Sequence, residues 1–421
     1  MAERKNIQKR IHGGVRTGGR SAQTAARPER TASESEAVHQ QEVQSMPRQR
    51  YYYDYSLLCA LILIFAIGLI VIYSSSQYMA MQEKNNASYY FKRQLVIGGA
   101  GLIAAVIASL FDYRLLKGVL SRAAYIGSCG LLVFTLVGGL ASHGKTRWLQ
   151  ILGGSFQPTE LAKIGLIVFM AAFIAERGPN MNKRQNWSRV IIYGLIPTGL
   201  IASQNISSGV IVAMITAIMM FVALDYYKIF FALLAAAGAF IAGLKPALHW
   251  IIIHSGMTES PSHYALKRVF GWAAPEIFEG DAYQTVQGLY AIGSGGMTGH
   301  GLGDSIQKYG AIPEVQNDMI FTIVCEEFGF IGAATIVILY IYILVRIYKI
   351  AVNARDLFGT MLCTGVMAHL GLQAVLNIAV VTAVIPNTGV TLPFISYGGS
   401  AILFTMLEMG IVLSVAHRIR V

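Results

Sequence analysis

Ten apolar runs, each close to the length that crosses a lipid bilayer, constrain this 421-residue chain more than any other feature. A transmembrane helix needs about 20 mostly apolar residues. Only 13% of the residues are charged, whereas a soluble globular domain carries about 25%. We therefore predict an all-α, polytopic membrane protein with ten transmembrane helices. The predicted spans are 56–74, 94–111, 123–141, 158–175, 188–204, 208–224, 229–250, 319–345, 358–381 and 394–416.

The first 50 residues differ in composition from the rest of the chain. They are rich in Arg, Gln, Ser, Ala and Glu and contain few large apolar side chains. Such a segment buries too little apolar surface to offset its ordering entropy. We predict a disordered basic cytoplasmic tail at 1–50 and one ten-helix membrane domain at 51–421.

Lys and Arg gather in alternate connections between the predicted spans, which orients the chain. Under the positive-inside rule these connections lie in the cytoplasm together with the N-terminus. An even number of spans returns the C-terminus to the same side. The net charge is +11, but because Lys and Arg in these loops serve to set the orientation, we expect no nucleic acid partner. The basic residues are Arg114, Lys117, Arg122, Arg177, Lys183, Arg184, Arg189, Lys228, Arg346, Lys349, Arg355, Arg418 and Arg420.

One long connection, 251–318, separates spans seven and eight and is predicted to lie outside the cytoplasm. Long loops of this kind are often functional. Its glycine-rich stretch from Gly293 to Gly303 has the composition of a loop that cradles phosphate with backbone N–H groups. The spacing matches neither a P-loop nor a dinucleotide fingerprint, so the signal is weak.

Two groups of charged residues lie where a membrane makes charge costly. Lys145, Arg147 and Trp148 follow span three on the outer side, against the positive-inside rule. They suit either an anionic lipid headgroup or an interfacial anchor. Glu160 and Lys163 open span four on one helix face. They are either a self-satisfied ion pair or, as we favour, part of a cavity wall, because a pair entering the membrane is more costly than a surface pair.

Asp318 lies where the long loop meets span eight. A carboxylate there is partly desolvated, which raises its pKa and makes it a better general base. The alternative is a helix N-cap, a role that Asp fills well. Glu326 and Glu327 follow in the same span, rotated about 80° and about 180° from Asp318 at 100° per residue.

The connection 386–400 contains two prolines and three glycines. This composition predicts an irregular, re-entrant backbone, which membranes tolerate only where it is buried in protein or lines a water-filled cavity. Elsewhere, the nine histidines show no metal-ligand spacing with Cys, Asp or Glu, and no nucleophile elbow or His-Glu-x-x-His motif occurs.

These places together resemble the SEDS (shape, elongation, division and sporulation) family. The resemblance covers residues from about 54 to 418 in the expected order, with ten spans and a long loop between spans seven and eight. The matching segments are Tyr73 to Ser76, Lys145 to Lys163, Tyr283 to Lys308, Pro313 to Gly329 and Pro386 to Ser400.

The resemblance implies a peptidoglycan glycosyltransferase that polymerises lipid II into glycan strands at the outer face of the bacterial cytoplasmic membrane. It implies Asp318 as the essential carboxylate, with Glu160 and Lys163 as cavity partners near it. It also implies a class B penicillin-binding protein as partner, among other cell-division or sporulation proteins. The residues that we predict to line the substrate cavity are Lys145, Arg147, Trp148, Glu160, Lys163, Gln307, Lys308, Glu314, Glu326, Ser396 and Tyr397.

The chain departs from the usual family pattern at a few positions. Met319 stands where the family often has Phe, and Gln204 to Gly209 differ from the usual Gln-Pro-Asp-Leu-Gly-Thr. The segments Gly303 to Lys308 and Gly389 to Pro393 are more similar to the division and sporulation branch than to the elongation branch. None of these departures touches the expected base.

The implied reaction sets out a chemical role for the charged residues. A sugar hydroxyl of one lipid II attacks the anomeric carbon of the growing strand, with Asp318 as base. Lys145, Arg147, Lys163 and a divalent cation, Mg²⁺ or Mn²⁺ held by Asp318 or Glu160, would stabilise the departing pyrophosphate. Two rivals remain at this stage: a lipid II flippase, and a non-catalytic scaffold for the transpeptidase.

Overall fold

The computed structural model describes residues 53–138, 140–142, 145–151, 154–310 and 312–419. Ten of its helices are 18 residues or longer, and each coincides with one predicted span. They are α3 (Tyr55–Lys84), α4 (Tyr89–Leu110), α5 (Val119–Gly138), α6 (Pro158–Arg177), α7 (Arg184–Gln204), α8 (Ile206–Ala223), α9 (Tyr227–Ser255), α12 (Ile320–Asn353), α13 (Leu357–Val381) and α14 (Gly399–His417). The tail predicted at 1–50 lies outside the described residues.

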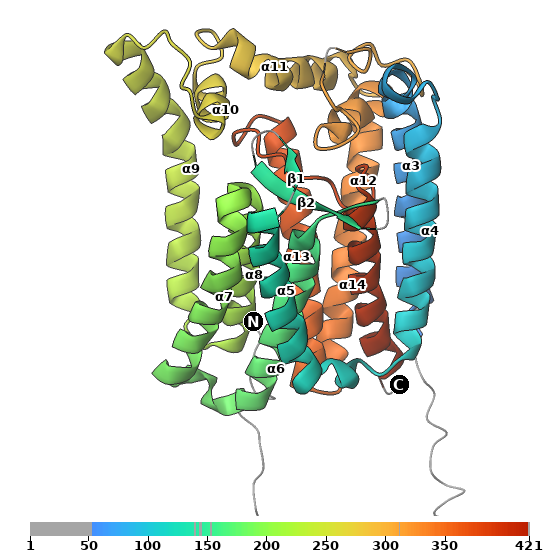
Figure 1. The fold of residues 1–421 in the computed structure, drawn as a ribbon, viewed down its shortest axis with the longest axis vertical. Helices are drawn as coiled ribbons and strands as arrows, with labels where there is room; N and C mark the ends of the chain where they lie inside the picture. Colours follow the sequence, from blue (N-terminus) through green and yellow to red (C-terminus); the bar gives the residue numbers. More distant parts are fainter. Residues whose placement is uncertain (1–52, 139, 143–144, 152–153, 311, 420–421) are drawn as a thin grey trace, which may run out of the picture.

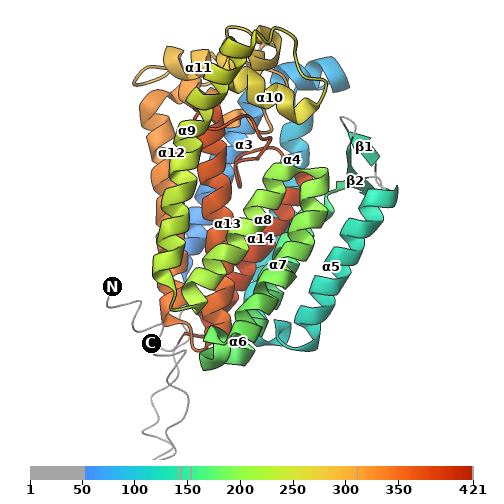
Figure 2. The same ribbon diagram turned by 90° about the vertical axis from the view of Figure 1, so that its left-hand side faces the viewer.

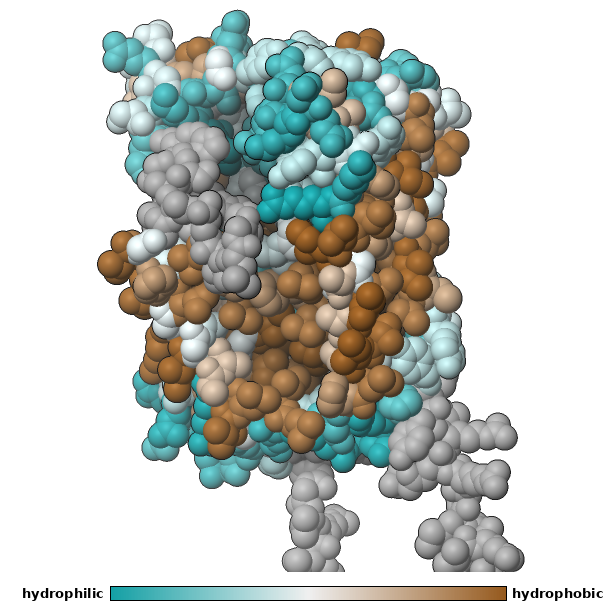
Figure 3. Space-filling view, turned by 45° about the vertical axis from the view of Figure 1, so that its right-hand side comes forward, coloured by the Kyte–Doolittle hydropathy of each residue, from teal (hydrophilic) through white to brown (hydrophobic). Residues whose placement is uncertain are grey.

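Nine of these helices are long and apolar enough to cross a membrane. The exception is α7, whose first turns carry Arg184, Asn186 and Arg189. Apolar side chains cover the middle of the face seen in Figure 3, and polar residues lie at its two ends. This pattern is typical of a multi-pass membrane protein, and the membrane fold predicted from the sequence is confirmed; the tenth crossing stays a prediction.

The two ends of the described chain lie at the same end of the bundle. The ring of Tyr53, just before α3, lies 5.8 Å from the ring of His417 at the end of α14. An even number of crossings brings the ends together in this way. Figure 1 shows the long connection between α9 and α12 at the opposite end.

That connection is more ordered than a loop. It contains α10 (Tyr264–Ala273) and α11 (Glu279–Ser294), which lie across the end of the bundle in Figures 1 and 2. Two short 3₁₀ helices, Tyr113–Leu116 and Gly178–Asn182, lie in connections at the other end.

A small antiparallel sheet adds strands to the predicted all-α fold. It consists of β1 (Leu140–Ser142), β2 (Lys145–Ile151) and β3 (Gly154–Phe156), in that order. Ala141 pairs with Thr146, and Gln150 with Ser155. Span three was predicted to extend to residue 141, but α5 ends at Gly138 and β1 begins at Leu140.

The helices differ sharply in how much of their surface the protein covers. Most of α6 is buried, and it packs against α5, α8 and α13. In α9 only Ile252 is buried. The core of the bundle therefore lies around α6 and α13, and α9 stands at its edge, as Figure 1 shows.

Helix α12 is interrupted at Gly329, whose φ of 64° and ψ of −164° are not helical. Beyond the interruption, the N–H groups of Phe330 and Ile331 donate to the carbonyls of Gly296 and Met297, at 2.9 and 3.1 Å. In an uninterrupted helix they would donate four residues back. The chain just after α11 therefore takes the place of one turn of α12.

The same stretch of chain also donates hydrogen bonds to α12, on the other side of the interruption. The carbonyls of Glu326 and Glu327 accept hydrogen bonds from the N–H groups of His300 and Gly301, at 3.0 and 2.9 Å. A Cβ at Gly299 would lie 2.2 Å from the Glu327 carbonyl oxygen, so only glycine permits the contact. The glycine-rich stretch thus packs loop against helix. The weak phosphate-cradle signal was wrong for His300 and Gly301, because α12 carbonyls already use these N–H groups.

Candidate active site

Asp318 lies two residues before α12 and is only 9% exposed. Its backbone carbonyl accepts a hydrogen bond of 2.7 Å from the side-chain amide of Asn377 on α13, which also donates to the Val390 carbonyl at 2.7 Å. The N-cap of α12 is Met319, and no side chain caps that end. The alternative that Asp318 is a helix cap was therefore wrong, and its carboxylate is available for another role.

Arg268 on α10 is the cation that the fold brings to this carboxylate. A Cβ built on Gly389 would lie 3.6 Å from Arg268 Nη1 and 3.7 Å from Asp318 Oδ2, so both side chains come close to Gly389. Arg268 Nη1 also donates to the Asn387 carbonyl at 3.5 Å. The site therefore gathers a loop helix, the start of α12 and the connection before α14.

The pKa of Asp318 is raised above its ordinary value, chiefly because burial penalises the charged form. The positive charge of Arg268 opposes this and lowers the pKa, while the negative charge of Glu314 raises it. A buried carboxylate with a raised pKa and an adjacent cation is typical of a general base.

Arg268 was not predicted from the sequence as a site residue. Arg268 and Asp318 are 50 residues apart in the sequence, and no local pattern predicts that the fold brings them near each other. One signal was present, because Lys267 and Arg268 form a basic pair in a connection predicted to lie outside. The positive-inside rule disfavours such a pair, which is the same argument that singled out Lys145 and Arg147.

The connection from Thr382 to Gly398 has the irregular backbone that was predicted, and much of it is buried. Side chains from several helices hold its carbonyls and polar groups. The indole of Trp272 donates to the Ala383 carbonyl at 2.8 Å. Asn387 donates to the side chain of Gln284 at 2.9 Å, and Gln373 donates to Thr391 at 3.1 Å. The segment beside Asp318 is therefore fixed by α10, α11 and α13.

Ser396 and Tyr397, both predicted to line the cavity, close this connection. The Ser396 hydroxyl accepts from the Leu392 N–H at 2.7 Å, and its carbonyl accepts from Gln94 at 3.2 Å. The Tyr397 N–H donates to the Gln316 carbonyl at 2.9 Å, two residues before Asp318. Tyr397 thus holds the backbone just before the carboxylate, and Ser396 holds the connection itself. That the two residues line the substrate cavity stays a prediction.

Glu160 and Lys163 form the ion pair that the sequence analysis considered. Lys163 Nζ lies 2.8 Å from Glu160 Oε2, and both side chains are almost fully buried in α6. Pro158 opens the helix, so Glu160 lies in its first turn, where the helix dipole favours negative charge. Within the described residues no hydrogen bond or ion pair joins this pair directly to Asp318, so their predicted proximity remains a prediction.

Lys308 and Glu327 form a second buried ion pair, 3.0 Å apart. The ammonium group also donates to the Ser74 hydroxyl and the Gly303 carbonyl, at 3.2 and 2.5 Å. Ser74 donates to Glu327 at 2.5 Å. In the structure the charge of Lys308 joins α3, α12 and the loop. That Lys308 also lines the substrate cavity stays a prediction.

Glu326 anchors the same loop. Its carboxylate accepts from the Ser305 hydroxyl at 2.5 Å and from the Ile306 N–H at 2.9 Å. The N–H of Gln307 lies 3.4 Å from the same carboxylate. Glu314, by contrast, is exposed and accepts from Asn317 at 2.9 Å. Substrate contact by Gln307, Glu314 and Glu326 stays a prediction.

Lys145, Arg147 and Trp148 lie on β2. Only their backbone positions are described, so their predicted contacts with an anionic headgroup lie outside the described side chains.

Comparison with known proteins identifies the family. Residues 55–421 match the FtsW, RodA and SpoVE family, described as "Cell cycle protein". The chain belongs to this family, which confirms the resemblance found in the sequence.

Two relatives cover nearly the same region. The chain is 32% identical to the probable peptidoglycan glycosyltransferase FtsW of Trichlorobacter lovleyi, over 89% of this chain and 96% of that protein. It is also 32% identical to stage V sporulation protein E of Bacillus subtilis, over 86% of this chain and 97% of that protein. Their names agree with the division and sporulation branch that the motifs predicted.

Solved structures share the fold. One, described as "Structural coordination of polymerization and crosslinking by a peptidoglycan synthase complex", superposes with a TM-score of 0.67 at 25% identity, over 86% of this chain and 97% of that one. The rod shape determining protein RodA of Thermus thermophilus superposes with a TM-score of 0.62 at 25% identity, over 86% of this chain and 96% of that one.

Proposed function

We propose that this protein is a peptidoglycan glycosyltransferase that polymerises lipid II at the outer face of the bacterial cytoplasmic membrane, during division or sporulation. The observation that carries the proposal is the buried Asp318, with a raised pKa and Arg268 beside it, at the end of the bundle opposite the termini. The name of the Trichlorobacter lovleyi relative, a probable peptidoglycan glycosyltransferase, supports the same reaction class.

In this reaction Asp318 accepts the proton of the sugar 4-hydroxyl as that oxygen attacks the anomeric carbon of the growing strand. The new glycosidic bond forms as the bond from the anomeric carbon to the lipid diphosphate breaks, and the bonding electrons leave with undecaprenyl diphosphate. A direct displacement of this kind inverts the anomeric centre. Lys145, Arg147 and Lys163 are the cations proposed to stabilise the leaving diphosphate.

A divalent cation, Mg²⁺ or Mn²⁺, is part of the proposal. Among the described residues no group of three or more His, Cys, Asp or Glu side chains is placed to hold a metal ion. Glu160 is already paired with Lys163, so Asp318 is the better protein ligand. Mg²⁺ commonly takes one or two carboxylates together with substrate phosphates, and Asp318 suits that arrangement. Such an ion would neutralise charge on the diphosphate.

The partner is proposed to be a class B penicillin-binding protein, which cross-links the new strands. A similar fold occurs in a structure described as a peptidoglycan synthase complex that coordinates polymerization and crosslinking. The orientation with both termini in the cytoplasm is likewise proposed, from the distribution of basic residues.

The test is polymerisation by the purified chain with its cognate partner, lipid II and Mg²⁺, with glycan strands resolved on a gel. We expect strands from the wild type, none from Asp318→Ala or Asp318→Asn, and loss of strands with EDTA that added Mg²⁺ reverses. Strands from Asp318→Asn would refute the base assignment. If a folded wild-type complex made no strands but moved lipid II across sealed vesicles, the flippase would replace the polymerase.

A further inference from the structure

A cavity of about 320 Å³ lies between α5, α6 and α7, and the proposed reaction does not use it. Its lining comes from the first two turns of α5, the last three turns of α6 and the middle of α7. These turns lie near the end of the bundle that carries both termini (Figure 1). The cavity is therefore at a membrane boundary, on the side away from Asp318.

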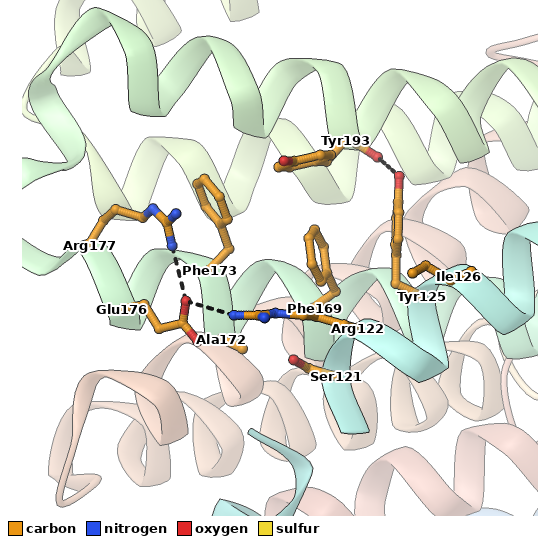
Figure 4. Close-up of a pocket in the computed structure, with 10 residues that line it drawn as sticks. All are labelled: Ser121, Arg122, Tyr125, Ile126, Phe169, Ala172, Phe173, Glu176, Arg177 and Tyr193. Atoms are coloured by element: carbon orange, nitrogen blue, oxygen red, sulfur yellow. Dashed lines mark hydrogen bonds and ion pairs between the residues drawn. The ribbon is translucent and has the colours of Figure 1, made fainter. Parts of the chain in front are cut away.

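Four aromatic rings line one side of the cavity, as Figure 4 shows. Tyr125 stacks on Phe169 with ring centres 4.5 Å apart. Tyr193 meets Phe169 and Phe173 edge to face, at 5.1 and 5.4 Å. Such a wall offers large apolar contact area to a hydrocarbon chain.

This wall is held in place by the protein itself. The Tyr125 hydroxyl donates to the Tyr193 backbone carbonyl at 2.7 Å. In a regular helix that carbonyl would accept from residue 197, but Pro197 has no N–H group. Tyr125 thus satisfies a carbonyl that α7 cannot, and the cavity is formed before any ligand arrives.

The mouth of the cavity carries charge. Arg177 lies 3.0 Å from Glu176 and covers the ring of Phe173 at 4.0 Å. Arg122 lies 3.9 Å from the same carboxylate, and its side chain is 63% exposed. Of the ten lining residues only these three are charged, so the mouth has a net charge of +1.

We propose that this cavity binds an anionic phospholipid, with its phosphate between Arg122 and Arg177 and one acyl chain along the aromatic wall. Arginine suits phosphate because its planar N–H donors match phosphate oxygens. Basic pockets between helices at a membrane boundary are known lipid sites in general. A ligand with an anionic headgroup and a hydrocarbon chain can bind the arginines and the aromatic wall at the same time.

The test is lipid binding by the full-length protein in detergent, measured by native mass spectrometry with dioleoyl-phosphatidylglycerol and dioleoyl-phosphatidylcholine. We expect the wild type to prefer the anionic lipid. The double variant Arg122→Gln/Arg177→Gln is expected to bind it about thirtyfold more weakly, from about 1 kcal/mol for each of the two arginines near a lipid headgroup. Glu176→Gln is expected to bind it more tightly, because a competing carboxylate is removed.

Two controls separate this site from general surface charge. Arg184→Gln removes a nearby arginine outside the cavity lining and is expected to leave binding unchanged. Ala172→Leu narrows the cavity and leaves all three charges, and is expected to weaken binding. Thermal unfolding of each variant, measured without added lipid, checks that it is folded.

Several results would overturn the proposal. They are equal binding of the two lipids by the wild type, unchanged binding by the folded double variant, or a loss in Arg184→Gln as large as in the double variant. Displacement of the lipid by equimolar glycerol phosphate would also overturn it, since a free phosphate ligand would then suffice. None of these readouts depends on polymerisation, so the proposed function is tested separately.

Discussion

Arg268 gives the active-site carboxylate a charged neighbour that can be removed without touching the carboxylate. Its positive charge lowers the pKa of Asp318, against the larger effect of burial. Since a general base works in its deprotonated form, loss of this charge moves the acidic limb of the pH–rate profile to higher pH. We expect Arg268→Gln to show this shift and Arg268→Lys to retain most of the wild-type profile.

The measurement is kcat/KM for polymerisation against pH. Lys267→Gln is the matched control, because it removes the same charge from the adjacent position of α10 and should leave the profile in place. An acidic limb that stays at the wild-type pH in Arg268→Gln would show that Arg268 does not act on Asp318.

Glu160 and Lys163 form a buried ion pair, so the effects of the two single substitutions on stability should not add in the double variant. Removal of one partner leaves an uncompensated buried charge, which costs about 3–5 kcal/mol. We expect Glu160→Gln and Lys163→Met each to lower thermal stability strongly, and the double variant to recover much of it. Additive losses in this double-mutant cycle would mean that the two side chains do not stabilise each other.

Polymerisation by the double variant distinguishes structure from chemistry at this pair. If the pair also lines the substrate cavity, the stable double variant stays inactive with lipid II. Activity equal to the wild type would restrict the pair to a structural role.

The interruption of α12 depends on glycines that face helix backbone. A Cβ at Gly295 would lie 1.9 Å from the Cys325 carbonyl oxygen, whereas one at Gly293 meets nothing within 4 Å. We therefore expect Gly295→Ala to destabilise the protein by more than about 2 kcal/mol, as overpacking does. Gly293→Ala should change stability by no more than about 1 kcal/mol. Thermal unfolding of the two variants in the same detergent makes the comparison, and equal stabilities would contradict the close contact.

Elements and site residues were predictable from the sequence to different degrees. Hydropathy located all ten long helices, because the membrane demands long apolar runs. Asp318 was singled out because a carboxylate at that boundary is costly, and the family resemblance implied its role as the base. The partners of Lys308 and Glu326 were not predicted, since Ser74, Ser305 and Glu327 meet them only through tertiary packing. Arg268 was missed for the same reason.

At the scale of the whole molecule the number of crossings depends on α7, the least apolar of the ten helices. If α7 crosses the membrane, Lys183 lies inside and Ile206 outside, and Thr258 before α10 lies outside as well. We expect Ile206→Cys and Thr258→Cys to react with a membrane-impermeant maleimide in intact cells, and Lys183→Cys to react only after permeabilisation. The four native cysteines are first replaced by serine, because Cys59 is exposed.

Labelling of Ile206→Cys only after permeabilisation would place both ends of α7 on one side and reduce the number of crossings. Labelling of Thr258→Cys only after permeabilisation would instead reverse the orientation of the entire bundle. The first result changes the architecture, and the second would remove Asp318 from the outer face.

The interruption of α12 at Gly329 also limits how far the Asp318 carboxylate can move without loss of activity. Asp318 lies just before the N-terminus of the helical segment Ile320–Phe328. The C-terminal end of this segment is hydrogen-bonded to the chain after α11. At 1.5 Å per residue this segment and its flanks measure about 16 Å, so a tilt of about 5° at the interruption displaces the carboxylate by about 1.4 Å. A misplacement of about 1 Å can cost about 100-fold in rate. The two pairs of backbone hydrogen bonds around Gly329 therefore determine the position of the Asp318 carboxylate, although none of them involves Asp318.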